Sequence, residues 1–272
     1  MELPVTVGVD ASAASLAAVD WAAAEALLRD RPLRVLHALP LMPCLLPSWA
    51  VEPLPSGSDL IHEARHVLAK RHPQVRVHAE EVHDVATAAL VAAAEDAELL
   101  VLGARGDGGF PELRVGSTAL HVAAWAGCPT VVLPAEQPGP GPREHVVVGV
   151  DARRPAEAAL AFAFDAARRY GLPLRAVHAF GARSAGGTAG YRDEEAALLA
   201  RVLEPWATAR PDVEVLQDAE PAGAGMLLVD ASVKVRLLVL GRRPLSSVGR
   251  LGPVAHAVLH HAECPVTVVP EA

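Results

Sequence analysis

The sequence predicts an α/β protein with two tandem α/β/α domains, each holding a five-stranded parallel sheet flanked by helices. Three observations support this fold class. Short apolar runs rich in β-branched residues alternate with longer segments of helical periodicity. The whole order of segments occurs twice along the 272 residues. Hydrophobic residues make up 51% of the chain and aromatic residues only 4%, so we expect helices and sheets to pack through small side chains.

The repeat is visible in short matching strings. Val5-Thr-Val-Gly-Val-Asp10 returns as Val146-Val-Val-Gly-Val-Asp151, and later strings return in the same order. The offset between the halves drifts by only a few residues. This indicates duplication of a whole domain, because the period is too long for a solenoid repeat.

The elements of the first half follow in order. We expect strands at residues 5–9, 33–38, 75–79, 99–103 and 130–133, and helices at 15–28, 60–71, 84–96 and 117–126. The strands are nearly continuous apolar runs, as in parallel sheets that are covered on both faces. Asp84 stands where it would cap the third helix. Strands that alternate with crossover helices give a Rossmann-like architecture.

The domain boundaries come from composition. The segment Ala135-Glu-Gln-Pro-Gly-Pro-Gly-Pro142 has the composition of a linker, so we place one domain at residues 1–137 and the other at 144–272.

Charge and cysteine content exclude several classes of protein. The net charge is −8, so the chain lacks the excess of positive charge that binds a nucleic-acid backbone, and we expect no nucleic-acid partner. The three cysteines, Cys44, Cys128 and Cys264, are too scattered for a disulfide framework. The chain opens directly on a strand-like run, and its most apolar stretch is interrupted by prolines, so we expect a cytoplasmic protein without a membrane partner.

The segment after the fourth strand has the features of a phosphate-binding loop. Gly103, Gly106 and Gly116 can take positive φ and let the backbone approach a ligand. Ser117 and Thr118 follow at the start of a helix, where free N–H groups and the helix dipole favour an anion. The alternative is a plain turn in which Ser117 only caps the helix.

The spacing G-x2-G-x9-G-(S/T) between a strand and a helix resembles the ATP-binding loop of the universal stress protein family. Both halves follow the family's order of elements, and the chain resembles a tandem member of actinobacterial type. The resemblance implies ATP as the ligand, with or without Mg²⁺, and a stress-response or regulatory role. It implies nucleoside contacts at Val9, Asp10 and the backbone near Ala38, and a site around the phosphates formed by Gly103, Gly106, Gly116, Ser117 and Thr118. Some ATP-binding relatives carry a hydroxyl where this chain has Ala119.

The resemblance also implies an internal pairing of the two domains. Family members commonly pair through the fifth strand, so we expect residues 130–133 and 266–269 to pair as an intramolecular pseudo-dimer. Two such chains could also form a homodimer, and the sequence does not name a protein partner.

The second domain departs from this pattern. Gly241 and Gly252 are separated by two residues fewer than Gly103 and Gly116. Pro244 stands where the second glycine belongs, and Pro253 stands at the position of Ser117, so this loop has fewer N–H donors. Three arginines near it, at positions 242, 243 and 250, could still attract an anion. We expect that the second domain does not bind ATP with comparable affinity.

Other motifs favour structural roles. His62-Glu63-Ala64-Arg65-His66 matches the zinc-protease pattern H-E-x-x-H, but no third-ligand signature follows and the helix belongs to an outer layer, so we expect no metal. His37 and His178 occupy equivalent strand positions and are expected to be hydrogen-bonded at the sheet. No catalytic residue is assigned. Two alternatives stay open. One is slow ATP hydrolysis or nucleotidyl transfer, for which Asp107 and Glu112 are the available loop carboxylates, and the other is a scaffold that binds no nucleotide.

Overall fold

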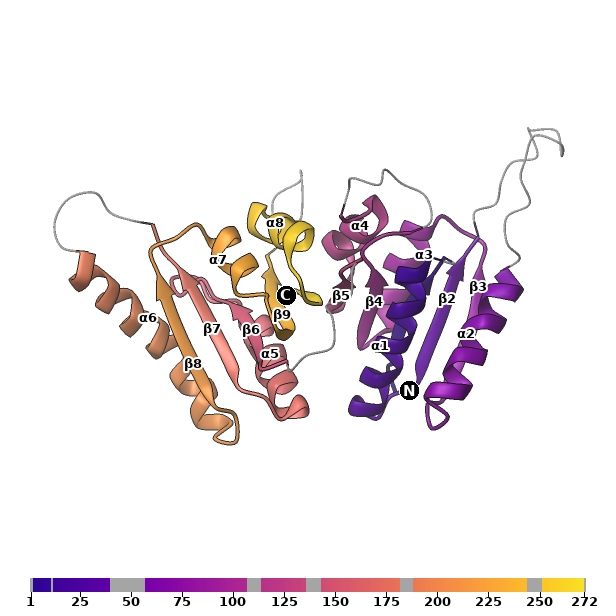
Figure 1. The fold of residues 1–272 in the computed structure, drawn as a ribbon, viewed down its shortest axis with the longest axis horizontal. Helices are drawn as coiled ribbons and strands as arrows, with labels where there is room; N and C mark the ends of the chain where they lie inside the picture. Colours follow the sequence, from indigo (N-terminus) through magenta and orange to yellow (C-terminus); the bar gives the residue numbers. More distant parts are fainter. Residues whose placement is uncertain are drawn as a thin grey trace. The chain divides into compact units, whose positions relative to one another are not determined.

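The computed structural model describes residues 2–10, 12–39, 57–106, 114–135, 143–181, 188–243 and 251–271. The chain divides into two compact units, Met1–Ala135 and Glu136–Ala272. Each unit is an α/β/α sandwich around a parallel sheet, as the sequence predicts (Figure 1).

The first unit has the strand order β3-β2-β1-β4-β5, with every neighbouring pair parallel. Helices α1 and α2 pack together over one face of the sheet, and α3 and α4 pack together over the other. The elements are β1 (Val5–Val9), α1 (Ala13–Arg29), β2 (Leu33–Ala38), α2 (Gly57–Arg71), β3 (Val77–Val82), α3 (Ala86–Ala93), a short 3-10 turn (Ala94–Asp96), β4 (Leu99–Gly103), α4 (Ser117–Trp125) and β5 (Thr130–Leu133).

The second unit repeats this plan with the strand order β10-β9-β6-β7-β8. Helices α5 and α6 contact each other, as do α7 and α8. The elements are β6 (His145–Gly149), α5 (Glu157–Tyr170), β7 (Leu174–Ala179), α6 (Thr188–Ala209), β8 (Val215–Glu220), α7 (Ala224–Asp230), β9 (Val235–Arg242), α8 (Pro253–His261) and β10 (Val266–Pro270).

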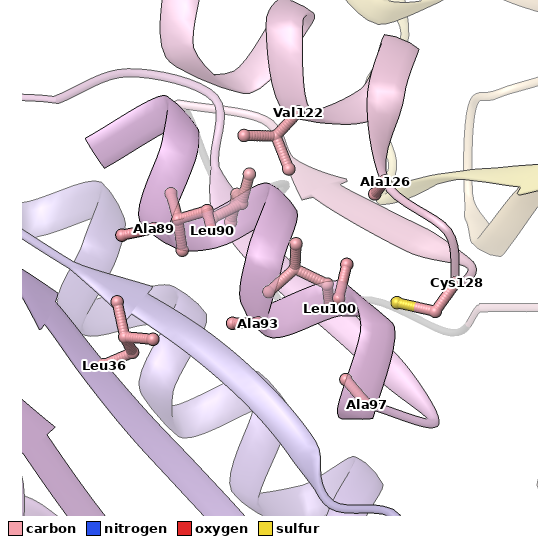
Figure 2. Close-up of a cluster of buried hydrophobic side chains, with 11 residues drawn as sticks. Leu36, Ala89, Leu90, Ala93, Ala97, Leu100, Val122, Ala126 and Cys128 are labelled. Carbon is pink, nitrogen blue, oxygen red and sulfur yellow. The ribbon is translucent and has the colours of Figure 1, made fainter. Parts of the chain in front are cut away.

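Small side chains allow the close layer packing that the composition predicts. Figure 2 shows Leu90 and Ala93 of α3 in one buried cluster with Val122 of α4 and with Leu36 and Leu100 of the sheet. A Cβ atom placed on Gly8 of β1 would lie 2.9 Å from the side chains of Leu90 and Leu102. The α3 layer therefore packs directly on the β1 backbone.

Two local expectations were wrong. The third strand spans Val77–Val82 rather than residues 75–79: it is the partly exposed edge strand, and Glu80 and Glu81, which interrupt the apolar pattern, lie within it. Asp84 does not cap α3: the N-cap residue is Val85, and the Asp84 carboxylate accepts a hydrogen bond of 2.7 Å from the Val85 N–H. The carboxylate thus stabilises the turn before the helix rather than its first turn.

Candidate functional site

In the first unit the chain builds the sheet outwards on one side of β1 with β2 and β3, and on the other side with β4 and β5. The carboxyl ends of β1 and β4, where this switch occurs, border a crevice of the kind in which α/β proteins bind ligands. Asp10 follows β1 directly. Its Oδ1 accepts hydrogen bonds from the Ser12 hydroxyl (2.6 Å) and the Ser12 N–H (3.2 Å). The Ser12 Oγ in turn accepts from the Ser15 N–H at 3.1 Å and so caps α1. One turn thereby starts the helix and positions the carboxylate.

A buried histidine joins the ends of β1 and β2. The Nδ1 of His37 lies 2.9 Å from the carbonyl oxygen of Val9, which confirms the predicted hydrogen bond at the sheet. Ala38 follows His37 and ends β2. The Nε2 of His37 is buried without a hydrogen-bond partner among the described residues.

Glycine at position 103 is required for space rather than for a positive φ, and glycine at position 106 leaves room for the Asp10 carboxylate. A Cβ atom at Gly103 would lie 2.8 Å from the backbone carbonyl carbon of Ala14, and one at Gly106 would overlap the Asp10 carboxylate. The freedom to take a positive φ is not used at these positions: across the described ranges, the glycine with a positive φ is Gly171, at the end of α5. The loop therefore uses glycine because its backbone passes close to α1 and to Asp10.

Helix α4 begins at Ser117. Gly116 is the N-cap residue, with φ −79° and ψ 159°, and its N–H donates to the Ala104 carbonyl at 2.7 Å. The N-cap alternative for Ser117 was thus wrong, since Gly116 is the N-cap residue and Ser117 is the first residue of the helix. The first N–H groups of a helix have no partner within that helix, so the N–H groups at Ser117 and Thr118 are available to an anion at this end of α4.

These segments enclose a cavity of about 280 Å³. All eight residues expected from the sequence line it, and Ser15 adds a hydroxyl. The sequence reasoning missed an apolar wall, formed by Leu36, Leu90 and Leu102. Leucines at such positions are indistinguishable from ordinary core residues in the sequence. The residues expected at the cavity are Val9, Asp10, Ala38, Gly103, Gly106, Gly116, Ser117 and Thr118.

The chemistry of this cavity suits a ligand with one flat apolar part and one anionic part. The leucines offer a dry surface for a planar ring. Asp10 is the one carboxylate among the described lining residues, and it can accept hydrogen bonds from hydroxyl groups. The α4 N-terminus and its two hydroxyl groups can donate to an anion. Asp107 and Glu112 lie outside the described residues.

The second unit has a larger cavity, of about 530 Å³, at the equivalent place. Pro253 is the first residue of α8, where Ser117 is the first residue of α4. The Arg243 guanidinium lies 3.4 Å from the Asp151 carboxylate, and both residues line the cavity. Pro244 and Arg250 fall in a part of the loop that the structure does not describe.

A buried ionic cluster supports the turn after β6. His178 Nδ1 lies 3.0 Å from the Val150 carbonyl oxygen, and its Nε2 lies 3.1 Å from Glu195 Oε2. Arg153 donates to the same carboxylate at 2.6 Å. The Glu195 side chain is 1% exposed, and the hydrogen bond from Arg153 lowers its pKa to about 2. No sequence signal pointed to Glu195, which lies on α6. The repeat gave no hint of it, because it suggests no equivalent carboxylate for His37, the counterpart of His178 in the first unit.

The remaining motifs do not form a second site. His62 and His66 are exposed on α2, and nowhere in the described ranges do three or more His, Cys, Asp or Glu side chains gather as metal ligands. Cys128 and Cys264 are buried, and burial raises the pKa of the Cys264 thiol to about 12. Cys44 is outside the described residues. None of the described helices combines the length and apolarity needed to cross a membrane.

Comparison with known proteins agrees with the fold and the repeat. Residues 2–134 and 142–270 each match the Universal stress protein family. A universal stress protein of Mycolicibacterium smegmatis is 32% identical over 293 residues, which cover 98% of this chain and 97% of the relative. One of Mycobacterium tuberculosis is 33% identical over 284 residues, covering 97% and 96% of the two chains.

A solved structure shows the same fold. The crystal structure of a universal stress protein from Archaeoglobus fulgidus superposes with a TM-score of 0.68 and 17% identity, over the full length of both chains. On the two matched segments and these full-length likenesses, the chain belongs to the universal stress protein family.

Proposed function

We propose that the first unit binds ATP and that the chain acts as a nucleotide-dependent stress-response module. The observation that carries the proposal is the convergence of Asp10, two loop glycines and the hydroxyl-bearing start of α4 on one cavity with an apolar wall. In this arrangement the adenine ring would lie near Ala38 and the leucines. Asp10 would accept hydrogen bonds from the ribose.

The phosphates would lie at the start of α4. Gly103, Gly106 and Gly116 keep the backbone close enough to surround them, and Ser117 and Thr118 supply N–H and hydroxyl donors. Mg²⁺ could accompany the phosphates as a counter-ion. The proposed output is a change of surface or partner binding with nucleotide state, rather than chemistry.

The second unit is proposed not to bind ATP with comparable affinity. Pro253 removes the N–H that Ser117 provides at the first position of the helix, and Val254 replaces the hydroxyl of Thr118. The pairing of residues 130–133 with 266–269, and a cytoplasmic location, stay predictions.

The test is calorimetry of ATP binding to the full chain, with Ser117→Pro as the decisive variant. Proline is tolerated at the first position of a helix, α8 already has one there, and Gly116 has the extended ψ that a residue before proline needs. The fold should therefore survive, while a charge-assisted donor worth about 1.5–3 kcal/mol is lost.

We expect one ATP per chain, and binding at least about tenfold weaker in Ser117→Pro. Pro253→Ser is the matched control and should leave the wild-type affinity and stoichiometry unchanged. Two sites of equal affinity in the wild type, or unaltered binding by Ser117→Pro, would refute the assignment. Phosphate release proportional to enzyme concentration and lost in Ser117→Pro would instead favour the hydrolytic alternative.

A further inference from the structure

The cavity of the second unit is lined differently from its counterpart in the first. It lies at the carboxyl ends of β6, β7 and β9 and at the start of α8. Three positions that carry hydroxyl groups in the first cavity carry apolar side chains here. They are Ser15, Ser117 and Thr118, replaced by Ala156, Pro253 and Val254.

Because these three hydroxyl groups are replaced by apolar side chains, the second cavity is an apolar chamber rather than a phosphate site. Val177, Leu228 and Leu240 continue the apolar wall, and Leu251 closes it beside α8. At about 530 Å³ the chamber is nearly twice as large as the first cavity and falls within the range of small-molecule sites.

Positive charge is concentrated at one end of this chamber. Arg242 and Arg243 follow each other at the end of β9, where the first cavity has Ala104 and Arg105. Arg243 contacts Asp151 at 3.4 Å, and both side chains are partly exposed, so this pair is weak and can exchange its partner. A guanidinium has five N–H donors and binds a carboxylate through two parallel hydrogen bonds.

We propose that the second cavity binds a carboxylic acid with an apolar body. The hydrocarbon part lies against the valine and leucine walls, and the carboxylate binds Arg243 at the mouth, in place of Asp151. A polyphosphate is disfavoured because the start of α8 has lost a donor and its hydroxyl groups. This inference is independent of nucleotide binding by the first unit.

The test uses the full chain and a series of straight-chain acids: hexanoate, octanoate and decanoate, with decanol as the uncharged comparison. We expect one acid bound per chain, with affinity rising about fourfold for each added methylene, as burial of hydrocarbon requires. Decanol should bind at least about tenfold more weakly than decanoate, because it lacks the charge that Arg243 recognises. ATP should not compete.

Two variants locate the site, each with a matched control in the first unit. Arg243→Gln removes the proposed carboxylate partner, and Arg105→Gln is its control. Val254→Asp places a negative charge at the second position of α8, where aspartate favours the helix but repels a bound carboxylate, and Thr118→Asp is its control. We expect each second-unit variant to weaken decanoate binding at least about tenfold and each control to leave it unchanged.

Several results would overturn the proposal. They are the absence of saturable decanoate binding at millimolar concentration, equal affinity for decanol, displacement by ATP, and equal losses in the controls. Failure of the first unit to bind ATP would not alter the expected decanoate results, so the two proposals fail separately.

Discussion

Removing the Glu195 carboxylate should destabilise the second unit far more than removing a similar carboxylate at the surface. Glu195→Ala leaves His178 Nε2 buried without an acceptor, since the His178 side chain is 3% exposed. A buried polar group that loses its partner costs about 1–3 kcal/mol, and breaking a buried ion pair costs about 3–5 kcal/mol. The Arg153 side chain is 54% exposed and regains water, so we expect about 2–3 kcal/mol in total.

The chain offers a matched control in the same unit. Arg192 and Glu220 form an ion pair in which the arginine is also 54% exposed but the glutamate is 37% exposed. Glu220→Ala should therefore cost less than about 1 kcal/mol. For a unit of this size 1 kcal/mol corresponds to roughly 4 °C in Tm, so we expect shifts of about 8–12 °C for Glu195→Ala and below about 4 °C for the control.

Differential scanning calorimetry of the full chain measures these shifts, and urea titration followed by circular dichroism checks the free energies of unfolding. Equal shifts for the two variants would refute the reasoning, because Glu195 differs from Glu220 in its burial and in its contact with the buried His178.

The same cluster predicts a dependence on pH. The pKa of Glu195 is about 2 in the folded chain, against an ordinary value of 4.5, so its ionised form is stabilised by folding. Its contribution is complete above about pH 4.5 and disappears as the pH falls towards 2. The stability difference between wild type and Glu195→Gln should therefore shrink as the pH falls from 4.5 towards 2. A difference that grows on acidification would contradict this sign.

Three further predictions follow from packing. Gly103→Ala should lower the Tm of the first unit, because its Cβ would lie 2.8–2.9 Å from the Ala14 backbone. The control Gly116→Ala, whose Cβ has only the Ala104 carbonyl oxygen nearby at 3.5 Å, should change the free energy of unfolding by less than about 1 kcal/mol. Thermal unfolding compares the two variants, and equal effects would argue against a close backbone approach at Gly103. Gly106→Val should displace the Asp10 carboxylate and weaken ATP binding at least about tenfold in calorimetry without unfolding the chain; unchanged binding would remove Asp10 and Gly106 from the site. Phe164→Ala removes a buried ring that stacks on Trp206, and should cost the second unit about 3–5 kcal/mol in urea titration; a loss below 1 kcal/mol would mean that the site repacks.

The order of elements was predictable because the buried strands are continuous apolar runs. Residues 5–9, 99–103 and 130–133 are strands at the predicted positions, since both faces of the sheet are covered there. The edge strand β3 begins two residues later and ends three residues later than predicted, because its exposed positions admit glutamates that mask the apolar pattern. Strand prediction thus succeeded where burial was complete.

The site was predictable in its glycines and hydroxyl groups but not in its walls or supports. The eight predicted residues line the cavity because strand ends and helix starts meet at one edge of a parallel sheet. Leu90 was missed because a leucine on an apolar helix carries no functional signal. The Glu195 cluster was missed because its three members lie far apart in the sequence and only the tertiary fold brings them together. Likewise, the N-cap residue of α5, Ala156, makes no side-chain capping hydrogen bond, and Glu271, from beyond β10, accepts from the N–H of Ala159 at 3.3 Å.

The close approach of Gly106 to Asp10 couples the changes that this loop can accept during evolution. A side chain that enters position 106 must displace the Asp10 carboxylate, which Ser12 holds through its other oxygen. A shorter residue at position 10 would remove this overlap, but that step alone would give up an acceptor in the cavity. The two positions are therefore expected to show epistasis: a substitution at 106 should cost more in a chain that has Asp10 than in one that has already lost the aspartate.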